Sequence, residues 1–174
     1  MTPLHPYIEA LLAAMVLIAA FTDLRRREIP NWLSLGGIAA GIALNAWLAG
    51  LAGLKTAGAG LGLAALIFVP LFVMRWLGGG DVKLMGAIGA LAGAQYMIVI
   101  FVLDAILGGA VALVAVIARG RLLKTLRNIP RVFRVERDSE LEAGGEKSMG
   151  LPRAVTIAAA TLLVLWGATR APAG

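Results

Sequence analysis

The chain has 174 residues, of which 60% are hydrophobic and only 15% charged, and its mean hydropathy is +0.87. Soluble domains carry about 25% charged residues, so this composition excludes a soluble globular enzyme and predicts an integral membrane protein. The chain has no cysteine and a single histidine, His5. Disulfides, cysteine nucleophiles and metal sites built from Cys or clustered His are therefore excluded.

Long apolar runs divide the chain into six predicted transmembrane helices, because a helix needs about 20 mostly apolar residues to cross a bilayer. We expect these spans over residues 6–23, 31–54, 57–74, 84–96, 97–118 and 151–169. The fourth and fifth form one apolar stretch that is too long for a single helix, and we place the break near residues 93–96. Residues 1–174 are thus predicted to form a single all-α membrane domain.

The basic residues between the spans predict the orientation in the membrane. Of the 16 Lys and Arg residues, 14 lie on the side of the loops after the first, third and fifth spans, and only Lys55 and Arg170 lie on the other. Lys and Arg accumulate on the cytoplasmic side, so we expect both termini outside and the loop 119–150 in the cytoplasm. The net charge is +6. We expect the basic residues to bind anionic lipids of the inner leaflet and not nucleic acid, because no aromatic side chains accompany them that could stack on RNA bases.

The loop 119–150 is the only long polar segment. Its first half, up to Arg134, is basic with apolar residues at helical spacing, which predicts a helix lying on the membrane surface. Its second half is typical of a flexible connector. We expect the loop to hold the topology, and substrate docking is the alternative. Among the apolar spans, Gly37 with Gly41 and Gly89 with Gly93 predict close helix packing.

Three of the four aspartates lie in or at the edges of the predicted spans. An ionisable group there is costly and marks a pathway, a relay or a catalytic centre. Asp23 ends the first span and Asp81 opens the fourth, so we expect both at the cytoplasmic edge of the bilayer. Asp104 lies inside the fifth span, nearer its outer half, where an interhelical hydrogen bond is the simpler expectation.

Asp23 and Asp81 each have an ordinary structural explanation when they are considered singly. Asp23 could pair with Arg26 or Arg27, and Asp81 could cap a helix N-terminus. Together, however, they supply two carboxylates at one depth, on helices that can face each other. In aspartic proteolysis the ionised member of such a pair activates water, and the protonated member donates to the scissile carbonyl. We therefore predict that Asp23 and Asp81 are catalytic, with no metal and no cofactor.

Two segments resemble the type IV prepilin peptidase family. Residues 23–31, DLRRREIPN, are similar to the D-x5-I-P-N pattern that follows the family's first catalytic aspartate, and residues 78–84, GGGDVKL, are similar to its G-x-G-D-x-K-L. The resemblance implies a GxGD-type intramembrane aspartyl endopeptidase of the bacterial inner membrane, which removes the basic leader of prepilins or pseudopilins. It also implies a substrate-binding role for Gly78, Gly79, Gly80, Lys83, Pro30 and Asn31. Glycines allow a substrate backbone to come close, and a flexible loop is the alternative.

Two features distinguish the chain from larger members of that family. Those members resemble this chain plus a cytoplasmic domain with paired cysteines, and they also N-methylate the mature pilin. Without such an insertion, this chain resembles the short, peptidase-only form found with tight-adherence (Flp) pili, whose assembly machinery is a possible partner. Near the last span, relatives resemble M-P-Y-G-x-A-I-A, whereas residues 151–158 read LPRAVTIA. Arg153 and Ala154 thus replace Tyr and Gly.

A non-enzymatic function is the alternative. In this alternative, Asp104 and one further aspartate form a proton relay in a transporter or in a subunit of a secretion or pilus assembly. A relay needs carboxylates spaced through the bilayer, whereas a leader peptidase needs two at the inner face. Because Asp23 and Asp81 are both expected at that face, the sequence favours the peptidase.

Overall fold

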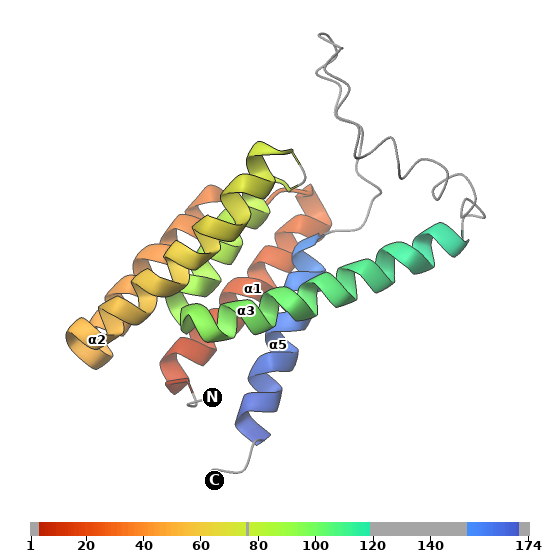
Figure 1. Ribbon diagram of the computed structural model, residues 1–174. Helices are drawn as coiled ribbons and strands as arrows, with labels where there is room; N and C mark the ends of the chain where they lie inside the picture. The colour runs from red at the N-terminus through yellow and green to blue at the C-terminus, as the bar shows by residue number, and fades with distance from the viewer. Residues whose placement is uncertain (1–3, 76, 119–152, 171–174) are drawn as a thin grey trace. The chain divides into compact units, whose positions relative to one another are not determined.

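The computed structural model is all-helical and describes residues 4–75, 77–118 and 153–170 (Figure 1). The chain forms two compact units, Met1–Ala105 with Pro152–Gly174, and Ile106–Leu151. The first unit contains the helices α1 (Pro6–Arg26), α2 (Asn31–Val73) and α5 (Arg153–Arg170), and most of α3 (Gly79–Ala118). The described part of the second unit is the end of α3. The predicted surface helix and connector of the loop 119–150 lie outside the described residues.

Three of the described helices are long and apolar enough to cross a membrane, namely α1, α2 and the Gly79–Val114 part of α3. Residues Arg153–Ala168 of α5 form a shorter apolar helix. Many large apolar side chains on these helices are exposed, including Leu51 and Leu66 of α2. Such a surface suits lipid, which solvates apolar side chains as well as the protein interior does.

Helices α2 and α3, with 43 and 40 residues, are much longer than the roughly 20 residues of one crossing. Each is broken at a glycine with positive φ, Gly50 at 57° and Gly93 at 80°. Gly93 lies within residues 93–96, where the apolar pattern predicts a break. The break in α2 comes earlier than the expected boundary between residues 54 and 57, because positive φ is costly for residues with a Cβ and Gly50 supplies it.

Asp23 lies on the same buried face of α1 as the apolar residues of that helix. Its buried positions are Ile8, Leu12, Met15, Val16, Ala19 and Asp23, which follow the three- and four-residue spacing of one helix face. This face packs against α5 and α2. The periodicity that buries the apolar residues of α1 therefore also turns Asp23 inward.

Close packing of α2 on α3 depends on small residues, as the sequence predicts for Gly37, Gly41 and Gly89. A Cβ at Gly41 would lie only 2.8 Å from the carbonyl carbon of Ala90, and Gly89 lies directly against the backbone of Gly60. These contacts confirm the packing prediction at Gly41 and Gly89. Gly93 differs, because its positive φ makes it the break in α3 as well as a contact of Thr56.

A buried asparagine of α2 stabilises the break in α3. The Nδ2 group of Asn45 lies 3.0 Å from the carbonyl oxygens of both Ala90 and Leu91, and it also donates to the Gly41 carbonyl at 2.9 Å. The last carbonyls before a helix break have no regular partner within the helix, and in lipid water cannot replace it. Asn45 thus fixes the segment of α3 that begins at Asp81 against α2.

Candidate active site

Asp23 lies in the last turn of α1 and is 9% exposed. The helix ends just beyond it, where Arg27 adopts a left-handed conformation with φ 54° and donates its N–H to the Asp23 carbonyl. The side chain reaches a different helix, because its Oδ2 accepts the backbone N–H of Ala154 at 2.9 Å. A buried carboxylate is costly without such a donor, and the first turn of α5 provides one that no intrahelical acceptor uses.

Asp81 lies in the first turn of α3, and its side chain is 13% exposed. Its backbone N–H donates to the Gly78 carbonyl at 3.1 Å. The glycines before it allow close packing, since a Cβ at Gly80 would lie 3.2 Å from the Cβ of Ile29, in the turn before α2. The partial positive charge at a helix N-terminus favours a carboxylate in this position.

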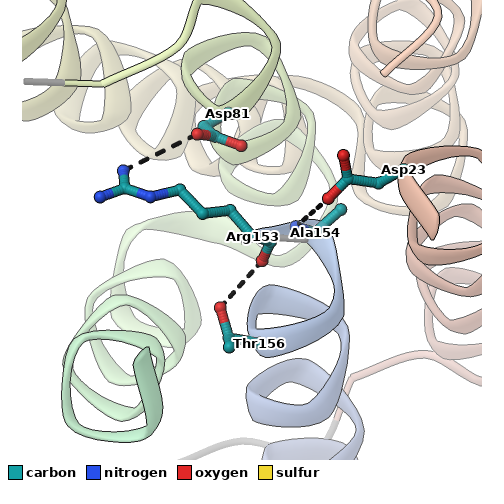
Figure 2. Close-up of polar contacts among 5 residues, drawn as sticks. All are labelled: Asp23, Asp81, Arg153, Ala154 and Thr156. Atoms are coloured by element: carbon teal, nitrogen blue, oxygen red, sulfur yellow. Dashed lines mark hydrogen bonds and ion pairs between the residues drawn. The ribbon is translucent and has the colours of Figure 1, made fainter. Parts of the chain in front are cut away.

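The first turn of α5 contacts both aspartates (Figure 2). While Ala154 donates to Asp23, the neighbouring Arg153 places its Nη1 3.8 Å from Oδ2 of Asp81. That distance is an ion pair and not a hydrogen bond, and 57% of the arginine side chain is exposed. Two consecutive residues therefore connect the end of α1 to the beginning of α3, which are far apart in the sequence.

The structure also brings together two of the residues to which the resemblance assigns substrate binding. Lys83 Nζ donates to Asn31 Oδ1 at 2.9 Å, a contact between the beginnings of α2 and α3 that is exposed. Pro30 precedes α2 as its N-cap residue, with φ −62°. Lys83 is thus hydrogen-bonded to Asn31, and Arg153 is the cation that forms an ion pair with Asp81.

Asp104 also lies beside the first turn of α5. Its carboxyl group interacts with the Thr156 side chain and with the charge of Arg153, and its buried Oδ1 has no hydrogen-bond partner among the described residues. The sequence places Asp104 nearer the outer half of a span. The structure instead places it near Arg153, the residue that also pairs with Asp81, since Asp81 and Asp104 lie at similar distances along the chain on the two sides of the break at Gly93.

Sequence reasoning missed Arg153, Ala154 and Thr156 as parts of the site. Arg153 counts in the sequence as one more basic residue at a membrane edge. The available signal was its place in residues 151–158, the segment that resembles a family motif but departs from it at 153 and 154. Its contact with Asp81 depends on tertiary structure and has no local signature.

Among the described residues, no cluster of three or more His, Asp or Glu side chains could hold a metal ion.

The chain matches a known protein family. The family model for the type IV leader peptidase family matches residues 10–113, more than half of the chain, and this range includes Asp23, Asp81 and Asp104. No curated protein and no solved structure matches the chain. Arg153 and Ala154 lie beyond the matched range.

Proposed function

The chain belongs to the type IV leader peptidase family, whose members are aspartic endopeptidases that cleave prepilin leaders, and on this premise we propose that Asp23 and Asp81 are its catalytic pair. The observation that carries the proposal is the shared contact with α5. Asp23 and Asp81 come from different helices, yet Asp23 accepts from Ala154 and Asp81 pairs with the preceding residue, Arg153. No packing requirement explains why two carboxylates should be directed to one helical turn.

The surroundings of each aspartate assign its role. Asp81 has the favourable end of the α3 dipole and the guanidinium of Arg153, and both stabilise its anion. Asp23 lies at the C-terminal end of α1, where the dipole opposes an anion. The N–H of Ala154 acts the other way, because it stabilises the Asp23 anion. On the helix dipoles and Arg153 we assign the base to Asp81 and the acid to Asp23, within a pair that titrates as a unit.

Hydrolysis follows from these roles. Asp81 accepts a proton from water as the water oxygen attacks the scissile carbonyl carbon, and Asp23 gives its proton to the carbonyl oxygen. The tetrahedral intermediate then collapses. Asp81 passes its proton to the leaving nitrogen, the hydroxyl formed from the carbonyl oxygen returns its proton to Asp23 as the C=O bond forms again, and the C–N bond breaks.

We place the site at the cytoplasmic face of the bacterial inner membrane, in a protein of six spans with both termini outside. The breaks at Gly50 and Gly93 support six spans, because the two parts of α2 and the part of α3 after Gly93 have lengths near those of single crossings, while the part of α3 before Gly93 is shorter. The basic residues support the orientation. In that frame Arg153 and the end of α1 lie at the inner face, where a basic leader and anionic lipids would both be found.

We also propose that the protein cleaves prepilins or pseudopilins without N-methylating them. The support is the cysteine-free sequence, which has no insertion with paired cysteines. This is the short form that the tight-adherence pilus systems use, so their assembly machinery is the expected partner. The relay alternative loses support, because Asp104 lies near Asp81 at one turn of α5 and not at a separate depth.

The test is cleavage of a purified prepilin by the purified full-length protein in lipid vesicles, followed by mass spectrometry. We expect one cut between the basic leader and the apolar helix, and no added methyl group when S-adenosylmethionine is present. An intact prepilin after incubation with well-folded protein would contradict the proposal. A methylated product would contradict only the peptidase-only form.

A further inference from the structure

Arg153 carries a permanent positive charge, and its guanidinium exchanges no proton in the proposed hydrolysis. An arginine stays protonated at every pH at which a protein is folded. Its Nη1 lies 3.8 Å from Asp81 Oδ2, and its charge also acts on Asp104. One guanidinium thus interacts with two carboxylates of α3. Arg153 belongs to the first turn of α5, and the next residue in that turn, Ala154, donates to Asp23.

We propose that Arg153 is a positioning residue that keeps Asp81 ionised and directed toward the first turn of α5. The proposal rests on the proposed function for its catalytic meaning, but the electrostatic relationship holds whether or not the chain cleaves a prepilin. Arg153 acts through Asp81 and does not itself touch the reacting atoms.

The charged groups around Asp81 define what Arg153 contributes. The two other aspartates near it are Asp23 from α1 and Asp104 from α3, and both oppose its ionisation. Lys83 of α3 is hydrogen-bonded to Asn31 at the start of α2. Arg153, from α5, forms an ion pair with Asp81. Its positive charge therefore offsets the repulsion of the Asp81 anion by Asp23 and Asp104.

The geometry sets the size of the expected effect. The pair is separated by more than a hydrogen-bond distance, and the arginine is more than half exposed, so water screens the attraction. Removing the cation makes the Asp81 anion less favourable, and a higher pH is then needed to ionise it. We expect a shift of about half a pH unit to one unit.

The experiment measures this shift twice in the full-length protein in lipid vesicles. One readout is the pH profile of prepilin cleavage, whose acidic limb reports the ionised base. The other is infrared titration of protein labelled with ¹³C-aspartate, in which the band lost in Asp81→Asn identifies the Asp81 carboxyl group. The infrared titration needs no substrate, and it therefore separates a failure of this proposal from a failure of the proposed function.

We expect Arg153→Gln to move both the acidic limb and the Asp81 band to higher pH. Arg153→Lys should restore most of the shift, since it returns a positive charge. Arg170→Gln is the matched control, because it removes the same charge from the other end of α5 and should leave both midpoints in place. An unmoved Asp81 band in folded Arg153→Gln would overturn the proposal, as would an equal shift in Arg170→Gln. If the band shifts but no protein variant cleaves, the proposal stands and the proposed function fails.

Discussion

Ala154 and Asp23 are 131 residues apart in the sequence, and the backbone N–H of Ala154 donates to the Asp23 carboxylate at 2.9 Å. Both partners are buried, Ala154 completely. The hydrogen bond therefore ties the beginning of α5 to the end of α1, next to the residue that pairs with Asp81. It also uses a backbone donor, which side-chain substitutions do not remove.

Replacing Ala154 by proline tests this bond. Proline lacks the N–H and is tolerated in the first turn of a helix, so the main expected loss is the donor to Asp23. A buried acceptor that loses its partner costs about 1–3 kcal/mol, and we expect a lower melting temperature together with reduced cleavage. Ala154→Gly keeps the N–H and is the comparison. Equal stability and activity in the proline and glycine variants would show that the bond is dispensable.

Neutralising either member of the pair should stop catalysis. Asp23→Asn and Asp81→Asn keep the side-chain size but remove the group that exchanges a proton, and general acid–base contributions are about 10²–10⁴-fold. The double variant should be no worse than either single variant, since the two act as a unit. Gel-shift assays of a co-expressed prepilin measure the loss. The matched control is Asp138→Asn, in the polar segment between the last two predicted spans, and it should process normally. Full activity in Asp23→Asn or Asp81→Asn would exclude the pair.

The break at Gly93 should depend on Asn45. In Asn45→Ala the carbonyls of Ala90 and Leu91 lose their donor within a buried site, and we expect a loss of about 1–3 kcal/mol in the free energy of unfolding. Ser34→Ala is the control, because Ser34 is also buried on α2 but its Oγ has no partner among the described residues. Unfolding in detergent and denaturant would compare them. If both variants lose equal stability, burial and not the Asn45 bonds explains the effect.

Parts of this architecture were predictable because they follow from local periodicity. The apolar runs indicate helices, and the spacing of Leu12, Val16 and Ala19 already places Asp23 on the buried face of α1. The break in α3 was expected near Gly93, since the apolar run exceeds a single crossing. The earlier break at Gly50 was not expected, because the polar residues Lys55 and Thr56 indicate a boundary between residues 54 and 57 and no polar residue lies beside Gly50.

The contacts of α5 were not predictable for a different reason. Arg153 and Ala154 approach Asp81 and Asp23 only when α1, α3 and α5 are packed together, and neither residue type signals an acid–base site by itself. The surroundings of Asp104 were not predictable either, because a break near residues 93–96 does not by itself place residue 104 against the first turn of α5. Tertiary packing, and not propensity, decided both outcomes.

Asp104 should be dispensable for the chemical step. Its carboxyl group interacts with the Thr156 side chain and with the charge of Arg153, and its buried Oδ1 has no hydrogen-bond partner in the part of the chain that the structure describes. We expect Asp104→Asn to lower stability or yield and to retain cleavage within about tenfold of the original rate. Prepilin processing normalised to the amount of folded protein measures this. Complete loss of processing with normal folding would make Asp104 a member of the site.

The orientation in the membrane can be tested by labelling, because the chain has no cysteine of its own. Lys55→Cys lies in one of the two positions that the charge pattern assigns to the outside, and Ser148→Cys lies in the loop assigned to the cytoplasm. A membrane-impermeant maleimide added to intact cells should modify Lys55→Cys alone, and both variants should react after the membrane is permeabilised. Selective labelling of Ser148→Cys in intact cells would invert the topology. It would also move Arg153 and the proposed catalytic pair to the outer face, where a cytoplasmic leader could not reach them.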